Sequence, residues 1–423
     1  MSLVYIGFAP HPPIVIPPIG RGEEKACSIT AQGLEKLSEA LCATGAEILV
    51  CVSPHAPHIR QDPSSGLSLT YLEGIHDTLE GDLGAFNAPQ IKYSLKTVPE
   101  ILEALHRLGA QSVQAPLDHG VMVPLYFLQR AGWQGRLVVL SSPEETPEVW
   151  GKKIAQILDT IPARCAILAS GDLSHRLKED GPYGFHPSGP QFDRLIVQGL
   201  RTDPSLLPNL PEILVEEAAQ CGYMPLLLAL GARTGSCQVF SYEGPFGVGY
   251  MTAELYRSSP VARYARTCLQ HFIEGKPSTV PNDPLLATQK SCFVTLHKDE
   301  DLRGCIGTLE PVRETLADEI RSNTLSAATR DPRFPPVQKE ELSLITISVD
   351  VLGEMEKITD STELDPYLYG VVVRSQGRTG LLLPRLSGVD SVDEQLAIAR
   401  QKAGILPGED IELWRFQVDR YYE

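Results

Sequence analysis

The chain of 423 residues lacks several features that mark whole classes of protein. Its nine cysteines are scattered and none forms a CxxC pair, which argues against a disulfide framework, a structural zinc knuckle and a cysteine-ligated iron–sulfur cluster. Basic residues are in deficit, because 37 Lys and Arg stand against 53 Asp and Glu, for a net charge of −16. This excludes the clustered basic footprint of a nucleic-acid-binding protein.

Long hydrophobic runs are absent as well. The longest, such as Pro225 to Ala232, fall far short of the ~20 apolar residues that span a bilayer. The N-terminal stretch has no basic segment before an apolar one, so a signal peptide is not expected. With 43% hydrophobic residues, no internal repeat and no low-complexity tract, the sequence predicts a globular cytoplasmic protein that contacts neither membrane nor nucleic acid.

The first 257 residues alternate apolar strands with amphipathic helices, a pattern typical of a mostly parallel sheet covered on both faces. We therefore expect an α/β domain over residues 1–257. The expected strands are 4–9, 48–53, 136–141, 165–169, 237–242 and 248–255, and the expected helices are 24–44, 97–108, 149–161 and 191–200.

A break at 257–261 precedes a region of different character. Strand candidates there are separated by hairpin signals, and the last extends over 411–421. This pattern favours an α+β domain with antiparallel pairing over residues 261–423.

Three histidines of the first domain follow three different strands. His11 comes after strand 4–9, His55 after strand 48–53, and His175 after strand 165–169. Ligands of open α/β sheets bind at the carboxyl ends of the strands, so these imidazoles are expected to share one site. A histidine after a strand is more often a hydrogen-bonded turn residue, but three such placements favour the shared site. Imidazole is a preferred ligand of iron, zinc, copper and nickel.

Further ligands have several candidates. His119 lies at the expected start of a helix and could join the site. Cys221 lies just before an apolar helix, whose N-terminal partial charge favours a thiolate, although a buried apolar role explains it equally well. Glu217 is the alternative third ligand.

Taken together, these motifs resemble a known family. Pro-His-Pro-Pro contains His11, Ser-Pro-His-Ala-Pro contains His55, Leu-Asp-His-Gly contains His119, and Gly-Asp-Leu-Ser-His ends at His175. Over residues 3–256 the pattern is similar to LigB-like class III extradiol dioxygenases and to their relatives, the Memo family. The resemblance implies an αβα sandwich with one non-haem Fe(II), held by His11, His55 and a Glu. It assigns His119 and His175 to the handling of protons and bound oxygen.

At the position of the family's Glu, this sequence has Cys221, which resembles the Memo branch. A thiolate is softer than a carboxylate and shifts the preference toward copper, zinc or a differently tuned iron, and Fe(II) stays the expected ion, with zinc or copper as alternatives. In a family-like reaction on a catechol-like substrate, His175, oriented by Asp172, would act as acid and base, and His119 would hydrogen-bond substrate or oxygen. The loop 182–189 could form a lid, although an ordinary surface loop is favoured.

The second domain contains Leu-Arg-Gly-Cys-Ile-Gly, with Arg303 and Cys305. The two glycines predict that 302–308 is a strand interrupted by a tight turn, with both side chains bordering a cleft that could bind an anion; a plain turn or bulge with a buried cysteine is the simpler explanation. This hexapeptide, together with 331–336 and 380–384, resembles the AMMECR family. The fusion resembles the AmmeMemoRadiSam system, which implies a radical SAM protein as partner.

Two functions from different classes therefore stay open. The first is a metal-dependent oxidoreductase similar to ring-cleaving dioxygenases, which the extra histidines His119 and His175 favour. The second is a non-catalytic module that binds metal or small ligands or senses redox state, which Cys221 favours. A thiol enzyme built on Cys305 would need a histidine partner, and the sequence of the second domain offers no evident one.

Overall fold

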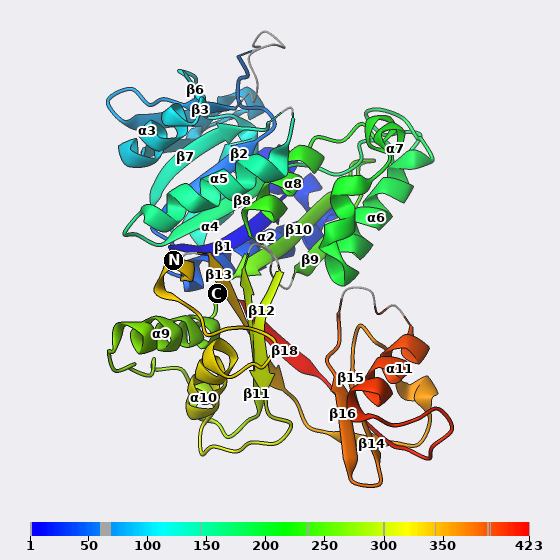
Figure 1. Cartoon of the computed structure of the whole chain (residues 1–423). Coiled ribbons are helices and arrows are strands. Elements are labelled where there is room, and N and C mark those ends of the chain that lie inside the picture. Colours follow the sequence, from blue (N-terminus) through cyan, green and yellow to red (C-terminus); the bar gives the residue numbers. More distant parts are fainter. Residues whose placement is uncertain are drawn as a thin grey trace. The chain divides into compact units, whose positions relative to one another are not determined.

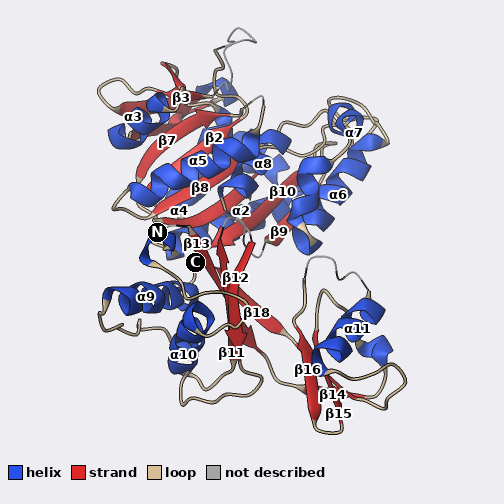
Figure 2. Ribbon diagram, viewed as in Figure 1, coloured by secondary structure: helices blue, strands red, loops and turns tan. Residues whose placement is uncertain are grey.

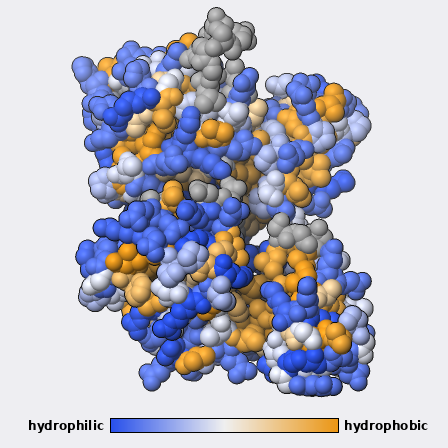
Figure 3. All heavy atoms as spheres, in the orientation of Figure 1, coloured by the Kyte–Doolittle hydropathy of each residue, from blue (hydrophilic) through white to orange (hydrophobic). Residues whose placement is uncertain are grey.

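The computed structural model describes residues 2–59, 69–143, 145–233, 235, 237–298, 301–342, 344–386, 389 and 391–422. Its contacts divide the chain into two units, with the division between Arg257 and Ser258. None of the helices within these ranges is both long and apolar enough to span a bilayer. On the face seen in Figure 3, hydrophilic residues predominate and apolar ones form scattered patches, as is normal for a protein surface.

The first unit is built on one large mixed sheet. Its central strands β7, β2, β8 and β1 are parallel, and β10 and β9 add an antiparallel edge. Within the described residues the sheet has eight strands, in the order β6 (Gln111–Val113), β3 (Thr70–Leu72), β7 (Arg136–Ser141), β2 (Ile48–Ser53), β8 (Cys165–Ser170), β1 (Leu3–Ala9), β10 (Tyr250–Arg257) and β9 (Gln238–Glu243).

Helices cover both faces of this sheet (Figures 1 and 2). Helices α5 and α8 pack together against β1, α8 also against β8, whereas α2 and α4 pack together as a separate pair. Every residue of β1, β2 and β8 is buried, which explains why these strands read as continuous apolar runs. The helices are α1 (Pro17–Gly20), α2 (Ser28–Ala43), α3 (Pro99–Arg107), α4 (His119–Arg130), α5 (Pro147–Thr160), α6 (Ser188–Thr202), α7 (Glu212–Glu217) and α8 (Tyr223–Ala232); β4 (Thr78–Leu83) and β5 (Ala88–Lys96) form a separate hairpin.

The second unit is α+β, and its strands pair antiparallel in two sheets. Helices α9 (Pro260–Glu274) and α10 (Leu316–Thr329) pack on the first sheet, and α11 (Val392–Ala403) packs on the second. The first sheet has the order β12 (Asp301–Gly307), β11 (Cys292–Lys298), β13 (Ile345–Leu352) and β18 (Val418–Tyr422); the second has the order β14 (Glu356–Ile358), β17 (Glu412–Phe416), β15 (Gly370–Ser375) and β16 (Arg378–Leu382).

These observations confirm the expected fold class, an α/β first part and an α+β second part. The expectation of one final strand over 411–421 is wrong. The segment divides at Gln417, so that β17 joins one sheet and β18 joins the other. The carbonyl of Gln417 accepts a hydrogen bond from Gly353 N, a contact between segments far apart in the sequence.

Candidate metal centre

Three parallel strands end beside one another and bring the site residues together. His11 follows β1, His55 follows β2, and the segment from Asp172 to His175 follows β8. Since β1, β8 and β2 are neighbours in the sheet, their carboxyl ends share one edge. Helix α4 begins at His119 and adds a fourth imidazole from its first turn.

The imidazoles of His11, His55 and His119 are in direct contact. His11 Nε2 and His55 Nε2 are 3.0 Å apart. The ring of His119 stacks on that of His55, with ring centres 4.3 Å apart, and its centre is 5.2 Å from that of His11. His11 is buried, with 2% of its surface exposed, whereas His119 is half-buried and His55 is exposed, so the cluster extends from the interior to the surface.

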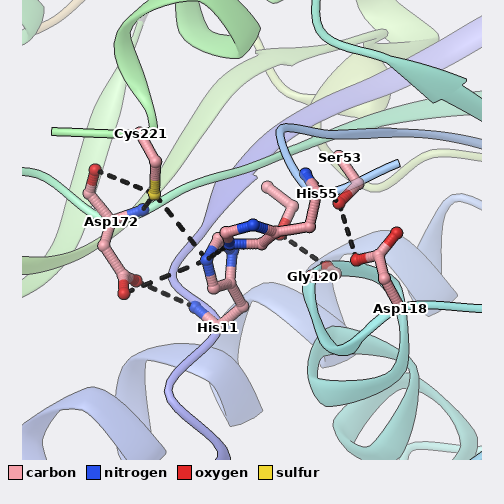
Figure 4. A network of polar contacts seen from close by, with 8 residues as sticks. His11, Ser53, His55, Asp118, Gly120, Asp172 and Cys221 are labelled. Atoms are coloured by element: carbon pink, nitrogen blue, oxygen red, sulfur yellow. Dashed lines mark hydrogen bonds and ion pairs between the residues drawn. The ribbon is translucent and has the colours of Figure 1, made fainter. Parts of the chain in front are cut away.

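Cys221 reaches the same point from the other side (Figure 4). Its Sγ is 3.7 Å from His11 Nε2 and accepts a hydrogen bond from the backbone N–H of Asp172 at 3.2 Å. The backbone N–H of Gly222 in turn donates to the carbonyl of Asp172. The two loops can approach this closely because Gly171 has no side chain, since a Cβ there would lie 2.1 Å from the Cα of Gly222.

Burial keeps the histidines of this cluster neutral. It lowers the pKa of His11 well below its ordinary value, and the neighbouring imidazoles lower it further. Burial also lowers the pKa of His55 and His119, and it lowers that of His175 to about 4. A neutral imidazole has a free nitrogen lone pair, which is the form that binds a metal ion.

Burial raises the pKa values of the acidic groups in the site, whereas it lowers those of the histidines. Burial raises the pKa of Asp172 to about 7, although the N–H of His11 hydrogen-bonds its carboxylate. Burial likewise raises the pKa of the Cys221 thiol, with a further contribution from Asp172. Burial thus opposes the thiolate that the helix N-terminus was expected to favour at Cys221 in the metal-free protein.

The donor atoms fit a metal ion. The ligand atoms of His11, His55 and His119 all lie within 4.8 Å of one another, as do those of His11, Asp172 and Cys221. Ligands that share one ion at about 2.0–2.3 Å lie roughly 3–4 Å apart, which matches the His11–His55 and His11–Cys221 distances. His11 belongs to both sets, so it is the central donor, whereas His55 and Cys221 do not occur together in either set and would have to move closer to share one ion.

The structure corrects the role expected for Asp172. Its carboxylate accepts from the N–H of His11 and lies 4.0 Å from His11 Nε2, so it contacts a metal-type histidine rather than orienting His175. His175 is held by its backbone N–H, which donates to the carbonyl of Ala218. Its buried Nε2 has no hydrogen-bond partner among the described residues.

Aromatic side chains flank the outer histidines. Tyr183, from the loop 182–189, lies against the ring of His175 with centres 5.1 Å apart, and Phe86 contacts His119 at 5.6 Å. Tyr183 is 60% exposed. The loop considered as a lid therefore does contact a site histidine.

Glu217, the alternative ligand, has other partners. Its carboxylate accepts from Ser188 Oγ at 2.6 Å and lies 3.8 Å from His186 Nδ1. It is absent from the metal-type groups found among the described residues. Cys221, not Glu217, lies next to His11. Glu217 is the last residue of α7, and only after it does the chain turn back, so that the backbone N–H groups of Cys221 and Gly222 donate to the carbonyl of Asp172.

The segment 302–308 also differs from expectation. Strand β12 extends through it without a tight turn, and the irregularity is a shift in its pairing with β11. The glycines serve close packing, because a Cβ on Gly304 would lie 2.4 Å from the carbonyl oxygen of Ala327. Nε and Nη2 of Arg303 pair with the two oxygens of Glu341 at 3.1 and 3.0 Å, while its buried Nη1 has no hydrogen-bond partner among the described residues. Cys305 accepts from Thr295 at 3.4 Å, and burial raises its pKa.

Sequence reasoning missed three residues that support the cluster. Ser170 Oγ lies 2.9 Å from His11 Nδ1. Ser53 Oγ accepts from the N–H of His55 and donates to Asp118 at 2.7 Å. Both serines are the last residues of their strands, so a hydroxyl at the carboxyl end of a strand was the available signal.

The fold and the side-chain cluster together define an αβα domain with a candidate metal site and an attached α+β domain. The family model of the catalytic LigB subunit of aromatic ring-opening dioxygenase matches residues 5–253, and the AMMECR1 model matches residues 262–421. Because the first match covers more than half of the chain, the protein belongs to the LigB family and carries an AMMECR1 domain. This confirms the resemblance seen in the sequence motifs.

Similar proteins occur in other organisms. A protein of Clostridium acetobutylicum is 34% identical, and the alignment covers 100% of both chains. A protein of Thermotoga maritima is 47% identical over 168 residues, which cover 38% of this chain and 97% of that protein. A solved structure of an uncharacterized Escherichia coli K12 protein covers 60% of this chain and 99% of its own, at 18% identity and a TM-score of 0.40.

Proposed function

We propose that the first unit is a metal-dependent oxidoreductase that holds one ion with His11, His55 and Cys221. The observation that carries the proposal is the convergence of two histidine nitrogens 3.0 Å apart with a sulfur 3.7 Å from one of them, around the buried His11. Fe(II) is the ion that the family favours, and the sulfur ligand also suits zinc or copper. A redox-active ion held there would polarise substrate oxygens and transfer electrons.

His175 and His119 are proposed as the proton-handling groups. Burial lowers the pKa of His175 to about 4, so at neutral pH its ring can accept a proton from a substrate hydroxyl. Its buried Nε2 has no hydrogen-bond partner among the described residues, so a side-chain movement that uncovers it would present an unpaired nitrogen to a substrate. Tyr183 and Phe86 offer aromatic surfaces beside these two histidines, which suits a small catechol-like substrate with two adjacent oxygens.

A non-catalytic metal or redox module is the second candidate. It is favoured by the identity of Cys221, since a sulfur ligand is itself oxidisable where a carboxylate is not. In that case His119 and His175 would serve only to shape the site.

The test begins with anaerobic purification, elemental analysis and an oxygen-uptake screen with catechols. We expect about one metal ion per chain and measurable uptake. His11→Ala should lose the metal, whereas His175→Ala should keep it and lose turnover by about 10²–10⁴-fold. His106→Ala, an exposed histidine of α3, is the matched control and should change neither.

Each outcome separates the candidates. Metal without turnover on any catechol supports the binding module. Loss of metal in His175→Ala would make His175 a ligand, and unchanged metal content in His11→Ala would contradict the proposed centre.

A further inference from the structure

A buried chain of hydrogen bonds connects His11 to helix α4. His11 Nδ1 and Ser170 Oγ are 2.9 Å apart, and Ser170 Oγ donates to the carbonyl oxygen of Gly120 at 2.5 Å. His11 is 2% exposed and Ser170 is fully buried, so water does not compete for these bonds. The chain lies on the side of the imidazole opposite to His55 and Cys221.

The direction of each bond follows from counting hydrogens. A carbonyl oxygen can only accept, so the single hydroxyl hydrogen of Ser170 is committed to Gly120. The Ser170 oxygen must then accept from the imidazole, which places the ring hydrogen of neutral His11 on Nδ1. His11 Nε2 is left with a free lone pair, and this is the atom that faces the sulfur and the second imidazole.

The geometry of the fold makes this arrangement rigid. Ser170 is the last residue of β8, and Gly120 lies in the first turn of α4. A Cβ on Gly120 would lie 2.4 Å from Ser53 Oγ and 2.8 Å from Asp118 Oδ1, so glycine allows the helix to approach. The end of a strand and the start of a helix thus fix both partners of the hydroxyl.

We infer that Ser170 is a positioning residue that presets the tautomer of His11 for metal binding. The inference rests on the proposed metal centre. Without the hydroxyl, His11 Nδ1 and the Gly120 carbonyl would be buried without their partner, and the ring could take the tautomer with hydrogen on Nε2, which cannot ligate. Loss of such a supporting bond typically weakens metal binding by about 10–100-fold.

The first experiment needs no metal, and it needs a variant only to assign the signals. The full chain, labelled with ¹⁵N only in histidine and kept metal-free with a chelator, is examined by NMR. We expect Nδ1 of His11 to be the protonated, pyrrole-type nitrogen and Nε2 the pyridine-type nitrogen, with His11→Gln used to assign the signals. The reverse pattern would overturn the inference.

The second experiment compares variants by zinc titration against a competing chelator. Ser170→Ala should bind zinc about 10–100-fold more weakly and should show a mixture of His11 tautomers. Ser174→Ala is the matched control, because this buried hydroxyl lies on the same loop but donates to the carbonyl of Ala218. It should bind zinc as the unmodified protein does.

The two proposals fail in different ways. If the unmodified chain binds no zinc, iron or copper, the proposed metal centre fails. If it binds metal and Ser170→Ala binds equally well with an unchanged tautomer, the role of Ser170 fails while the metal centre stands.

Discussion

Asp193 is a buried carboxyl group that holds the loop leading to His175. It is 1% exposed, accepts from the N–H of Ser174 at 2.8 Å, and accepts from the hydroxyl of Tyr242 at 2.7 Å. Burial raises its pKa to about 7 in spite of both hydrogen bonds. Its protonation is therefore coupled to folding of the first unit.

This coupling predicts a decline of stability with pH. Between about pH 4 and pH 7 the native state keeps a proton on Asp193 that the unfolded chain, with a pKa of about 3.9, has lost. The free energy of unfolding should therefore be highest below about pH 4 with respect to this group and fall as the pH rises to 7. Asp193→Asn should make the decline shallower by one bound proton, as measured by urea unfolding of the metal-free protein.

Asp172 should also make the free energy of unfolding fall as the pH rises, since its pKa is likewise raised to about 7. The decline should thus be reduced in Asp193→Asn rather than abolished. A profile that is unchanged in this variant would show that Asp193 is ionised in the native state throughout the range.

The candidate site was predictable from sequence only as far as local motifs reach. His11 and His55 could be placed because each follows an apolar run with prolines that exclude helix. Ser170 could not be assigned, because its role depends on the position of Gly120, fifty residues earlier in the chain. The prediction that Asp172 orients His175 was wrong for the same reason. Asp172 is close to His175 in sequence, but this does not determine where the carboxylate of Asp172 points.

At the scale of elements, buried strands were predictable and their assignment to sheets was not. Strand β7 extends over Arg136–Ser141 as expected. A short continuous apolar run is typical of a strand in a parallel sheet whose two faces are both covered by helices. The run 411–421 gives no local signal that it serves two sheets. Its division at Gln417 follows from pairing of β17 with β15 and of β18 with β13.

Strand β12 and helix α10 are in such close contact that one methyl group should disturb them. Gly304→Ala would place Cβ 2.4 Å from the backbone oxygen of Ala327, which cannot move without shifting the helix. We expect a loss of about 1–3 kcal/mol in the free energy of unfolding of the second unit, measured by urea denaturation.

The control for this substitution is Gly353→Ala. There the nearest atom to the new Cβ is the oxygen of Gln417 at 3.3 Å, so a small shift suffices. An equal loss in both variants would mean that the effect comes from backbone entropy rather than from the approach of α10.

At the scale of the whole molecule, the two units are expected to unfold separately. The relative from Thermotoga maritima aligns over 97% of its length with 38% of this chain, so a protein of about the size of one unit exists by itself. The ligands proposed for the metal all lie in the first unit. Metal should therefore raise one thermal transition and leave the other unchanged.

Calorimetry of the full chain with and without zinc measures this difference. At a free concentration of about 100 times Kd, the first unit should gain about 2.7 kcal/mol. His11→Ala should abolish the gain. A single transition that moves as a whole would show that the units unfold together.

The close approach of Gly171 and Gly222 has a consequence for protein redesign. A Cβ on Gly222 would also meet the ring of Phe8 at 2.8 Å, so close backbone contacts fix the loop that carries Cys221, in addition to the hydrogen bond at its sulfur. The backbone should therefore keep its conformation when the side chain of Cys221 is exchanged for one of similar size. Exchange of Cys221 for aspartate would turn a sulfur-containing donor set into two histidines and one carboxylate, the combination typical of non-haem Fe(II) oxygenases, without a new fold.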